Sequence, residues 1–182
     1  DAIIAIHTHD DTGCAVANPP LAGTDAPAGY QDYYLRESTG AFTALLGAAN
    51  IGFLSLEPRD FDLRFAGASA DLLHGVLSSC AALSANATEV PLGEGCDPAA
   101  QNLYRYSGAG LSLVNVLPAQ SVGTPGAELA AQSGAISSDG SRVYWRDVAS
   151  GNLYLRDGSQ AKQVDAAAGG GGTFETASLD GS

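Results

Sequence analysis

Residues 137–145 read SSDGSRVYW, and the Ser-x-Asp start of this segment occurs three times in the chain. The other copies are Ser69-Ala70-Asp71-Leu72 and Ser178-Leu179-Asp180-Gly181. The first two copies are each followed by a strand-like run, and the third stops at the last residue. A unit that recurs along a chain indicates a repeat architecture.

A second repeated segment alternates with the first: Tyr33–Glu37 resembles Asn102–Tyr106 and Asn152–Asp157. Each copy is followed by a Gly-containing turn and another apolar stretch, at 41–47, 111–117 and 161–165. Gly turns between such runs are typical of β-hairpins. We therefore expect an all-β fold with four short antiparallel strands per unit. The expected strands are 64–69, 73–80, 102–107, 111–117, 133–137, 141–147, 152–157 and 161–165, with hairpin turns at Asp71, Asp139 and Asp180.

The spacing of the copies divides the chain into units. The step from Asp139 to Asp180 matches the ~40–50 residues of a four-stranded propeller blade. The step from Asp71 to Asp139 is longer, and we assign the excess to a loop insert at 81–101 between the second and third strands. The predicted fold is a single β-propeller segment of about three blades, an incomplete propeller. Its units are a partial blade 1–50, a blade 51–121, a blade 122–168 and the first strand of another blade, 169–182.

The chain contains no Met, and its last Ser-x-Asp copy stops at Ser182, so we expect it to be a segment of a longer polypeptide. One stretch also favours a helix, because 71–87 has apolar residues at near-helical spacing. Its repeat partner, 140–146, is rich in β-branched and aromatic residues, which favours a strand. The stretch 41–56 has the same ambiguity, and its second half is either a short helix or an irregular link.

Composition excludes some classes of partner. The hydrophobic fraction of 45% is that of a globular chain, and no run approaches the ~20 apolar residues of a membrane-spanning helix. A formal net charge of −12 argues against a nucleic acid and against adhesion to anionic membranes. The bias to Arg, Ala and Gly suggests a GC-rich genome.

The repeats resemble the WD-like repeats of TolB-like β-propellers, in particular those of exported actinobacterial propeller proteins. The residues that carry the resemblance are 137–145, 151–158, 169–172 and 176–182, and a weaker match extends back to about residue 30. Residues 1–29 match no blade pattern. The resemblance implies a propeller in the extracellular space or cell envelope. It implies no single activity, because the family includes periplasmic partner-binding proteins and the non-catalytic halves of peptidases.

His7 and His9 are the sharpest candidates for a metal site. They follow an apolar strand, Ala2–Ile6, and their i, i+2 spacing places both imidazoles on one face. This pattern resembles the first metal motif of amidohydrolase-type barrels, but the further histidines of such a site are absent, since His74 aligns with Arg142. We therefore predict no metal, and interpret the pair as solvated edge residues.

No catalytic or cofactor-binding residue is predicted. Ser69, Ser137 and Ser178 occur once per unit, which favours a structural role in the turn, together with Asp71, Asp139, Asp180, Gly140 and Gly181. A Gly-x-Ser-x-Gly elbow and a complete calcium loop are missing from the sequence. Gly169–Gly172 lacks the Lys-Ser/Thr of a phosphate loop and is interpreted as a link between blades.

The aromatic residues within strands, among them Tyr104, Trp145 and Tyr154, are predicted to form the core between blades. Tyr30 is the one aromatic residue expected at a loop tip that a sugar would use, and Asn86-Ala87-Thr88 is a formal glycosylation sequon. Cys80 and Cys96 bracket the insert, so export would favour a bridge between them. Cys14 is then unpaired or paired elsewhere.

Two functions remain open from the sequence. The first is a non-enzymatic interaction or scaffold module of an exported or cell-surface bacterial protein, with a protein or glycan partner. The second is the propeller domain of a hydrolase or peptidase whose catalytic domain lies outside this segment; a nucleophile elbow downstream would favour it.

Overall fold

The computed structural model describes residues 2–6, 20–55, 61–90, 96–108, 110–130 and 133–182. Within these ranges the chain is all-β, as the sequence predicted. Its helices there are three single 3₁₀ turns, η1 (Ile51–Phe53), η3 (Pro98–Ala100) and η4 (Ala166–Ala168). None of the described helices has the length and apolar character needed to cross a membrane.

The strands form three antiparallel sheets, each built from strands consecutive in sequence. The first sheet consists of β1 (Ala2–Ile6), β2 (Asp32–Arg36) and β3 (Phe42–Ala44). The second consists of β4 (Arg64–Ala68), β5 (Gly75–Ser79), β6 (Asn102–Tyr106) and β7 (Leu111–Leu113). The third consists of β8 (Ala127–Leu129), β9 (Arg142–Asp147), β10 (Leu153–Asp157) and β11 (Gln160–Gln163).

The strand register places one tyrosine at the same position in each of the three sheets. Tyr34, Tyr104 and Tyr154 each sit at the centre of the Leu-Tyr strand of their sheet. Their partners on the preceding strand are Ile4, Leu77 and Trp145, respectively. Strands β1, β5 and β9 therefore hold the same place in their sheets, next to the strand that carries this tyrosine. The first sheet has no described strand equivalent to β4 and β8, which lie at the free edges of their sheets.

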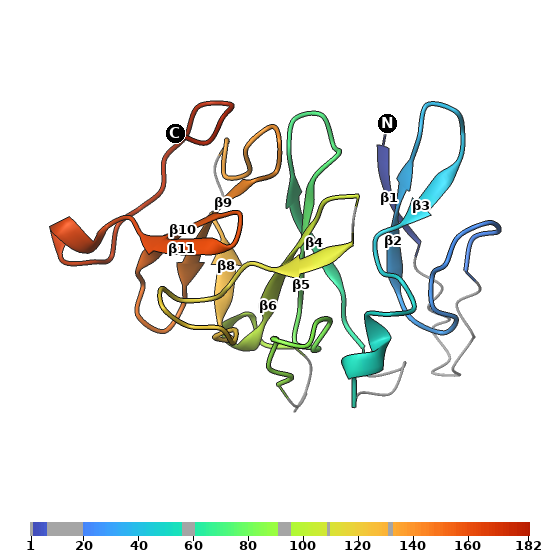
Figure 1. Cartoon of the computed structure of the whole chain (residues 1–182), viewed down its shortest axis with the longest axis horizontal. Helices are drawn as coiled ribbons and strands as arrows, with labels where there is room; N and C mark the ends of the chain where they lie inside the picture. Colours follow the sequence, from blue (N-terminus) through green and yellow to red (C-terminus); the bar gives the residue numbers. More distant parts are fainter. Residues whose placement is uncertain (1, 7–19, 56–60, 91–95, 109, 131–132) are drawn as a thin grey trace.

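The three sheets lie side by side (Figure 1) and hydrophobic clusters join neighbours. Between the first two sheets, Leu46 packs in a cluster with Leu77 and Tyr104. Between the second and third, Val76 and Leu103 pack with Trp145. Both faces of the middle sheet are thus covered by apolar side chains from its neighbours, which accounts for the wholly buried β5.

The predicted burial of the strand aromatics is confirmed. Trp145 and Tyr104 are fully buried, and Tyr154 is 7% exposed. The rings of Trp145 and Tyr154 stack with centroids 4.8 Å apart, an arrangement worth more than the buried area alone.

Two predicted strands are not found where the sequence placed them. Residues 169–182, expected to contain the first strand of another blade, form no strand. The sequence placed the first strand of the third sheet at 133–137, whereas the structure has it at β8, Ala127–Leu129. The chain turns at 133–134, where Gly134 has a φ of +80°, and only Ile136 returns to β9, in an isolated bridge to Val143. The helical alternative for 71–87 is also excluded, because this stretch forms a turn and β5.

The described residues of the insert, 81–90 and 96–101, form a loop that contains η3 and is tied to its surroundings at several points. Cys80 and Cys96, the pair expected from the sequence, are joined by a disulfide with Cα atoms 5.6 Å apart. The Tyr104 hydroxyl donates to the Ala81 carbonyl at 2.6 Å, and Asn50 Nδ2 donates to the Leu83 carbonyl at 3.0 Å. The insert thereby connects its own sheet to the end of the first sheet.

Candidate functional site

The Ser-x-Asp segments form closed polar turns. In the first copy the Ser69 hydroxyl donates to Asp71 Oδ1 at 2.6 Å and accepts from the His74 backbone N–H at 3.1 Å. The same carboxylate oxygen accepts from the Leu73 N–H at 3.1 Å. These bonds use the serine hydroxyl and the carboxylate to shape the backbone of the turn.

The other two copies repeat this arrangement. The Ser137 hydroxyl donates to Asp139 Oδ1 at 2.7 Å, and the Ser178 hydroxyl bonds the Asp180 carboxylate in the same way. These serine bonds hold the pKa of Asp71, Asp139 and Asp180 below the ordinary aspartate value, so the carboxylates stay ionised.

Successive turns stack on one another at one end of the molecule, the upper end in Figure 1. A Cβ added at Gly140 would meet the His74 ring at 2.4 Å, and one at Gly181 would meet Arg142 Cβ at 3.0 Å. His74 and Arg142 occupy the same repeat position, so the third turn packs on the third sheet as the second turn packs on the second sheet. Arg142 Nη1 also donates to the Asp180 carbonyl at 3.0 Å.

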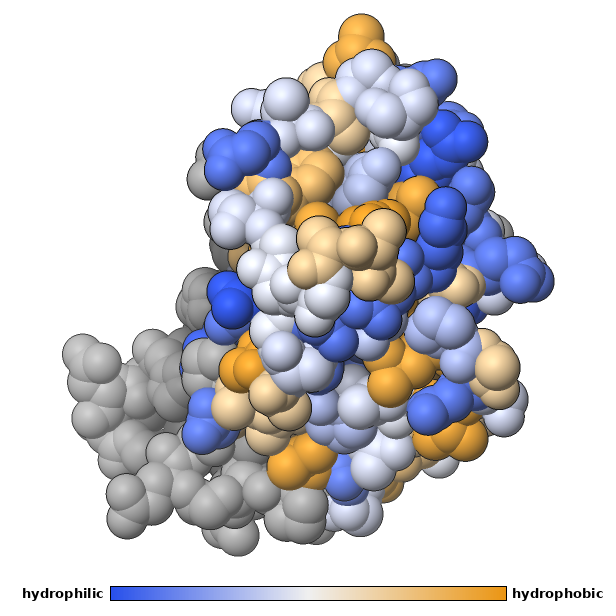
Figure 2. All heavy atoms as spheres, turned by 90° about the vertical axis from the view of Figure 1, so that its left-hand side faces the viewer, coloured by the Kyte–Doolittle hydropathy of each residue, from blue (hydrophilic) through white to orange (hydrophobic). Residues whose placement is uncertain are grey.

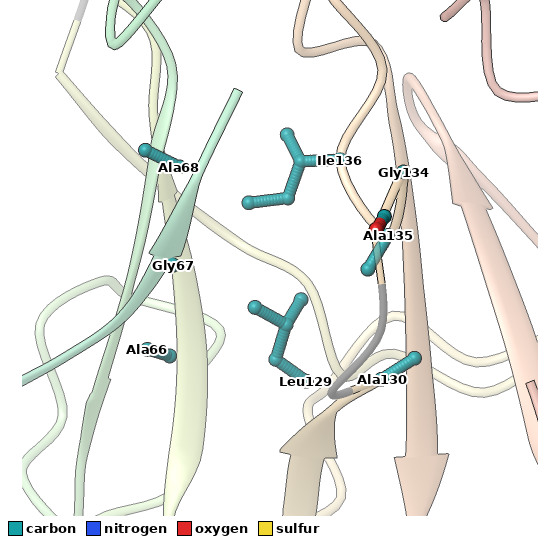
Figure 3. Close-up of a pocket in the computed structure, with 9 residues that line it drawn as sticks. Ala66, Gly67, Ala68, Leu129, Ala130, Gly134, Ala135 and Ile136 are labelled. Atoms are coloured by element: carbon teal, nitrogen blue, oxygen red, sulfur yellow. The ribbon is translucent and has the colours of Figure 1, made fainter. Parts of the chain in front are cut away.

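A cleft of about 220 Å³ lies between β4 of the second sheet and the end of β8 in the third sheet (Figure 3). On one side it is lined by β4, and on the other by residues 129–130 at the end of β8 and by residues 133–136. The lining residues are small or apolar: Ala66, Gly67, Ala68, Leu129, Ala130, Ser133, Gly134, Ala135 and Ile136.

The side chains that line this cleft offer few polar groups. Its lining has no ionisable side chain, and its single hydroxyl, on Ser133, has no general base among the lining residues. Strand β4 is a sheet edge, and its residues Arg64, Phe65 and Ala66 are exposed. An edge of this kind presents backbone N–H and C=O groups that an extended partner can pair with.

The structure separates the remaining sequence candidates. His7, His9 and Cys14 lie outside the described residues. The described part contains no group of three or more metal-ligating side chains. Tyr30 packs edge-on against Phe61 with ring centroids 5.3 Å apart, so its ring belongs to the core between the first two sheets.

The glycine run 169–172 wraps around one carboxylate. The Gly170 N–H donates to the Asp165 carbonyl at 3.1 Å, and the Gly172 N–H donates to Asp165 Oδ2 at 2.8 Å. Asp165 Oδ2 also accepts from the Leu153 N–H at 3.0 Å. The run is therefore an anchored link, as the sequence suggested, and its N–H groups are used internally.

One buried ionisable group was missed by the sequence reasoning. Asp32 is 2% exposed, and its Oδ1 accepts from the N–H groups of Tyr33 and Leu46 at 2.7 and 3.0 Å. Burial raises the pKa of its carboxyl group to about 7. The sequence did offer a signal for this residue. Asp32 lies two residues before Tyr34, as Asn102 and Asn152 lie two residues before Tyr104 and Tyr154, so an aspartate replaces an asparagine at this position.

Comparisons with protein-family models, with curated proteins and with solved structures found no match to this chain.

Proposed function

We propose that the chain is a β-propeller segment that serves as a non-enzymatic, protein-binding scaffold in an exported bacterial protein. The observation that carries the proposal is the set of equivalent antiparallel sheets packed face to face, with an apolar cleft and an open strand edge where their inner strands meet. Face-to-face packing of four-stranded sheets built from consecutive strands is the arrangement of propeller blades.

The disulfide supports export. Cys80 and Cys96 are bonded, and such bonds persist in oxidising compartments and are rare in the reducing cytosol. The TolB-like resemblance of the repeats agrees with a location outside the cytosol.

A protein partner fits the cleft better than a small polar molecule. The lining offers small apolar side chains and few polar side-chain groups, whereas a sugar site needs several hydrogen-bonding side chains. An extended peptide can pair its backbone with the edge of β4 and place small apolar side chains against Leu129 and Ile136.

The test is selection of binders from a displayed peptide library on the purified chain, with a glycan array alongside. Ala66 is exposed and lines the cleft, so Ala66→Glu places a charge where the partner would lie. Ala149→Glu is the matched control, because Ala149 is exposed and does not line the cleft. We expect saturable peptide binding that Ala66→Glu weakens at least tenfold and Ala149→Glu leaves unchanged.

Binding of glycans alone, or peptide binding that both substitutions affect equally, would contradict the proposal. Hydrolysis of the selected peptides by the purified chain would contradict its non-enzymatic part.

A further inference from the structure

Two arginines lie on the facing sides of the second and third sheets. Arg105 on β6 pairs with Val76 of β5. Arg156 on β10 pairs with Val143 of β9. Residues directly opposite each other on antiparallel strands share one face of the sheet, so each arginine lies on the face of its valine. Both valines belong to the hydrophobic cluster that joins these two sheets, and the two guanidinium groups are therefore directed into the same interface.

The Arg105 side chain reaches across to the third sheet. Its Nη1 donates to the carbonyl oxygens of Gly140 and Ser141, at 2.9 and 3.2 Å, just before β9 begins. Its Nε is buried and has no hydrogen-bond partner among the described residues. The guanidinium group thus enters the interface with part of its donor capacity unused, which is costly for a charged group.

Arg156 is close enough to Arg105 to sense its charge. Burial and the positive charge of Arg105 lower the pKa of Arg156. Within the part of the chain that the structure describes, neither arginine forms an ion pair. The carboxylate of Asp157 pairs with Arg142 at 3.2 Å, and that of Asp139 accepts hydrogen bonds within its own turn. The two positive charges therefore have no carboxylate to balance them.

The interface between the first and second sheets holds an apolar pair at the same place. Leu35 of β2 directly follows the tyrosine at the centre of its strand, as Arg105 does. Tyr106 of β6 lies two residues after the tyrosine of its strand, as Arg156 does. Leu35 and Tyr106 are buried in the cluster between these two sheets. Where the first interface buries an apolar pair, the second one therefore holds two like charges, which repel each other.

The position of Arg156 differs from that of a surface arginine. Figure 2 views the molecule from the side of the third sheet and shows hydrophilic residues among hydrophobic ones. Arg146 of β9 is exposed, and it points away from the second sheet because its neighbour Trp145 points toward it. Arg105 and Arg156 are half-buried instead. Solvent screens their repulsion less than at an open surface, yet a small ligand can still reach them.

We propose that Arg105 and Arg156 together bind an oxyanion with two negative charges, of the phosphate or sulfate class, between the second and third sheets. Guanidinium groups present planar sets of N–H donors that match the oxygens of such anions. Two arginines also balance two negative charges, so the ligand removes the repulsion across the interface. The site lies between β6 and β10, whereas β4 and β8 line the cleft, so it does not depend on peptide binding there.

The experiment is thermal unfolding of the purified chain in inorganic phosphate, sulfate and chloride at equal ionic strength, followed by Trp145 fluorescence. Phosphate and sulfate should raise the unfolding temperature in a saturable way, because a ligand that binds only the folded state stabilises it. Arg156 is the residue to change, since Arg105 also holds the start of β9. Arg156→Gln should weaken phosphate binding at least tenfold. Arg146→Gln is the matched control, because it removes the same charge from the outer face of the same sheet, and it should leave binding unchanged.

Arg156→Glu gives a second test that needs no added ligand. Its carboxylate would lie beside Arg105 in place of the anion, so this variant should be more stable than the wild type in chloride, and phosphate should add nothing further. An equal response of the wild type, Arg156→Gln and Arg146→Gln to phosphate would be the general effect of such salts on proteins and would overturn the proposal. An Arg156→Glu variant that is no more stable than the wild type in chloride would also overturn it.

Discussion

Leu72 holds a backbone position that favours glycine. Its φ is +64°, and the equivalent residues in the other copies, Gly140 and Gly181, have φ of +65° and +76°. The left-handed conformation costs an L-residue ~1–2 kcal/mol. Glycine avoids this cost, but it loses more conformational entropy on folding, which offsets part of the gain. We expect Leu72→Gly to raise the free energy of unfolding by roughly 0.5–1 kcal/mol.

Leu73→Gly is the matched control, because Leu73 is exposed and does not have a positive φ. Chemical denaturation of both variants measures the effect. Loss of stability in Leu72→Gly equal to that in Leu73→Gly would show that the turn does not strain Leu72.

Asp32 makes stability depend on pH. Its pKa is about 7 in the folded chain because of burial, against an ordinary value of 3.8, so the folded state holds a proton that the unfolded state releases. The contribution of the neutral carboxyl group is complete below the unfolded value and is lost as pH rises through about 7. The sign is thus opposite to that of an ion-paired aspartate.

We expect Asp32→Asn to remove this dependence. The amide oxygen can still accept from Tyr33 and Leu46, and the buried Oδ2, which has no described partner, is replaced by a neutral group. The wild type should lose stability relative to Asp32→Asn between about pH 4 and 7, by up to ~4 kcal/mol. Denaturation at a series of pH values measures this; parallel curves for the two proteins would contradict it.

The Ser-x-Asp turn is the element that sets the start of β9. Ser137 is buried and its hydroxyl accepts from the Arg142 N–H at 2.9 Å while donating to Asp139. Ser137→Ala should therefore lower the free energy of unfolding by ~1–2 kcal/mol, since a buried N–H loses its partner. The neighbouring exposed Ser138 provides the control, because Ser138→Ala should change stability by less than ~0.5 kcal/mol.

The disulfide constrains the insert between β5 and β6. In the chain-entropy model, closing a loop of this length stabilises the fold by ~3 kcal/mol. Cys80→Ala/Cys96→Ala should therefore unfold at lower denaturant concentration, without a change in the far-ultraviolet spectrum. Equal stability of the variant and the oxidised wild type would show that the hydrogen bonds from Tyr104 and Asn50 to the carbonyl groups of Ala81 and Leu83 are sufficient to hold the insert.

The sequence predicted the elements that are marked by local signals. The Ser-x-Asp turns and the Leu-Tyr strands carry fixed residues at fixed positions, and they fall where the repeats placed them. Strand β8 was misplaced because 133–137 resembles β4 and its flanking residues in local sequence. In the structure, the turn at Gly134 prevents 133–137 from forming a continuous pairing with β9. The apolar strand expected at Ala2–Ile6 is present as β1, but its pairing with β2 was not predicted, because the two strands are far apart in the sequence and 1–29 lack repeat residues.

The candidate site was less predictable than the fold. The cleft arises where β4 approaches Leu129, and a Cβ at Gly67 would meet Leu129 Cδ2 at 2.7 Å. Small residues such as Ala66 and Gly67 carry no chemical signature in a sequence. Whether such residues line a cleft depends on which sheet lies opposite them, and this is set by packing between units that are distant in sequence.

The whole molecule should unfold as one unit, because its sheets are joined by two continuous hydrophobic clusters. Trp145, the single tryptophan, is buried in the cluster between the second and third sheets and reports on that region by fluorescence. Leu46 is buried in the other cluster, between the first and second sheets. We expect Leu46→Ala to lower the Trp145 unfolding midpoint by an amount equivalent to ~2–5 kcal/mol, as for other buried leucines.

This result would mean that a cavity at one interface between sheets also lowers the stability of the next interface, as in a strongly coupled repeat array. Phe53→Ala is the control, because Phe53 is 48% exposed and its removal leaves no enclosed cavity. If the sheets unfold independently, Leu46→Ala will leave the Trp145 fluorescence transition in place and will shift only the circular dichroism of the first sheets. Coincident shifts of both signals, absent in Phe53→Ala, are expected because the middle sheet contributes Leu77 to one cluster and Val76 to the other.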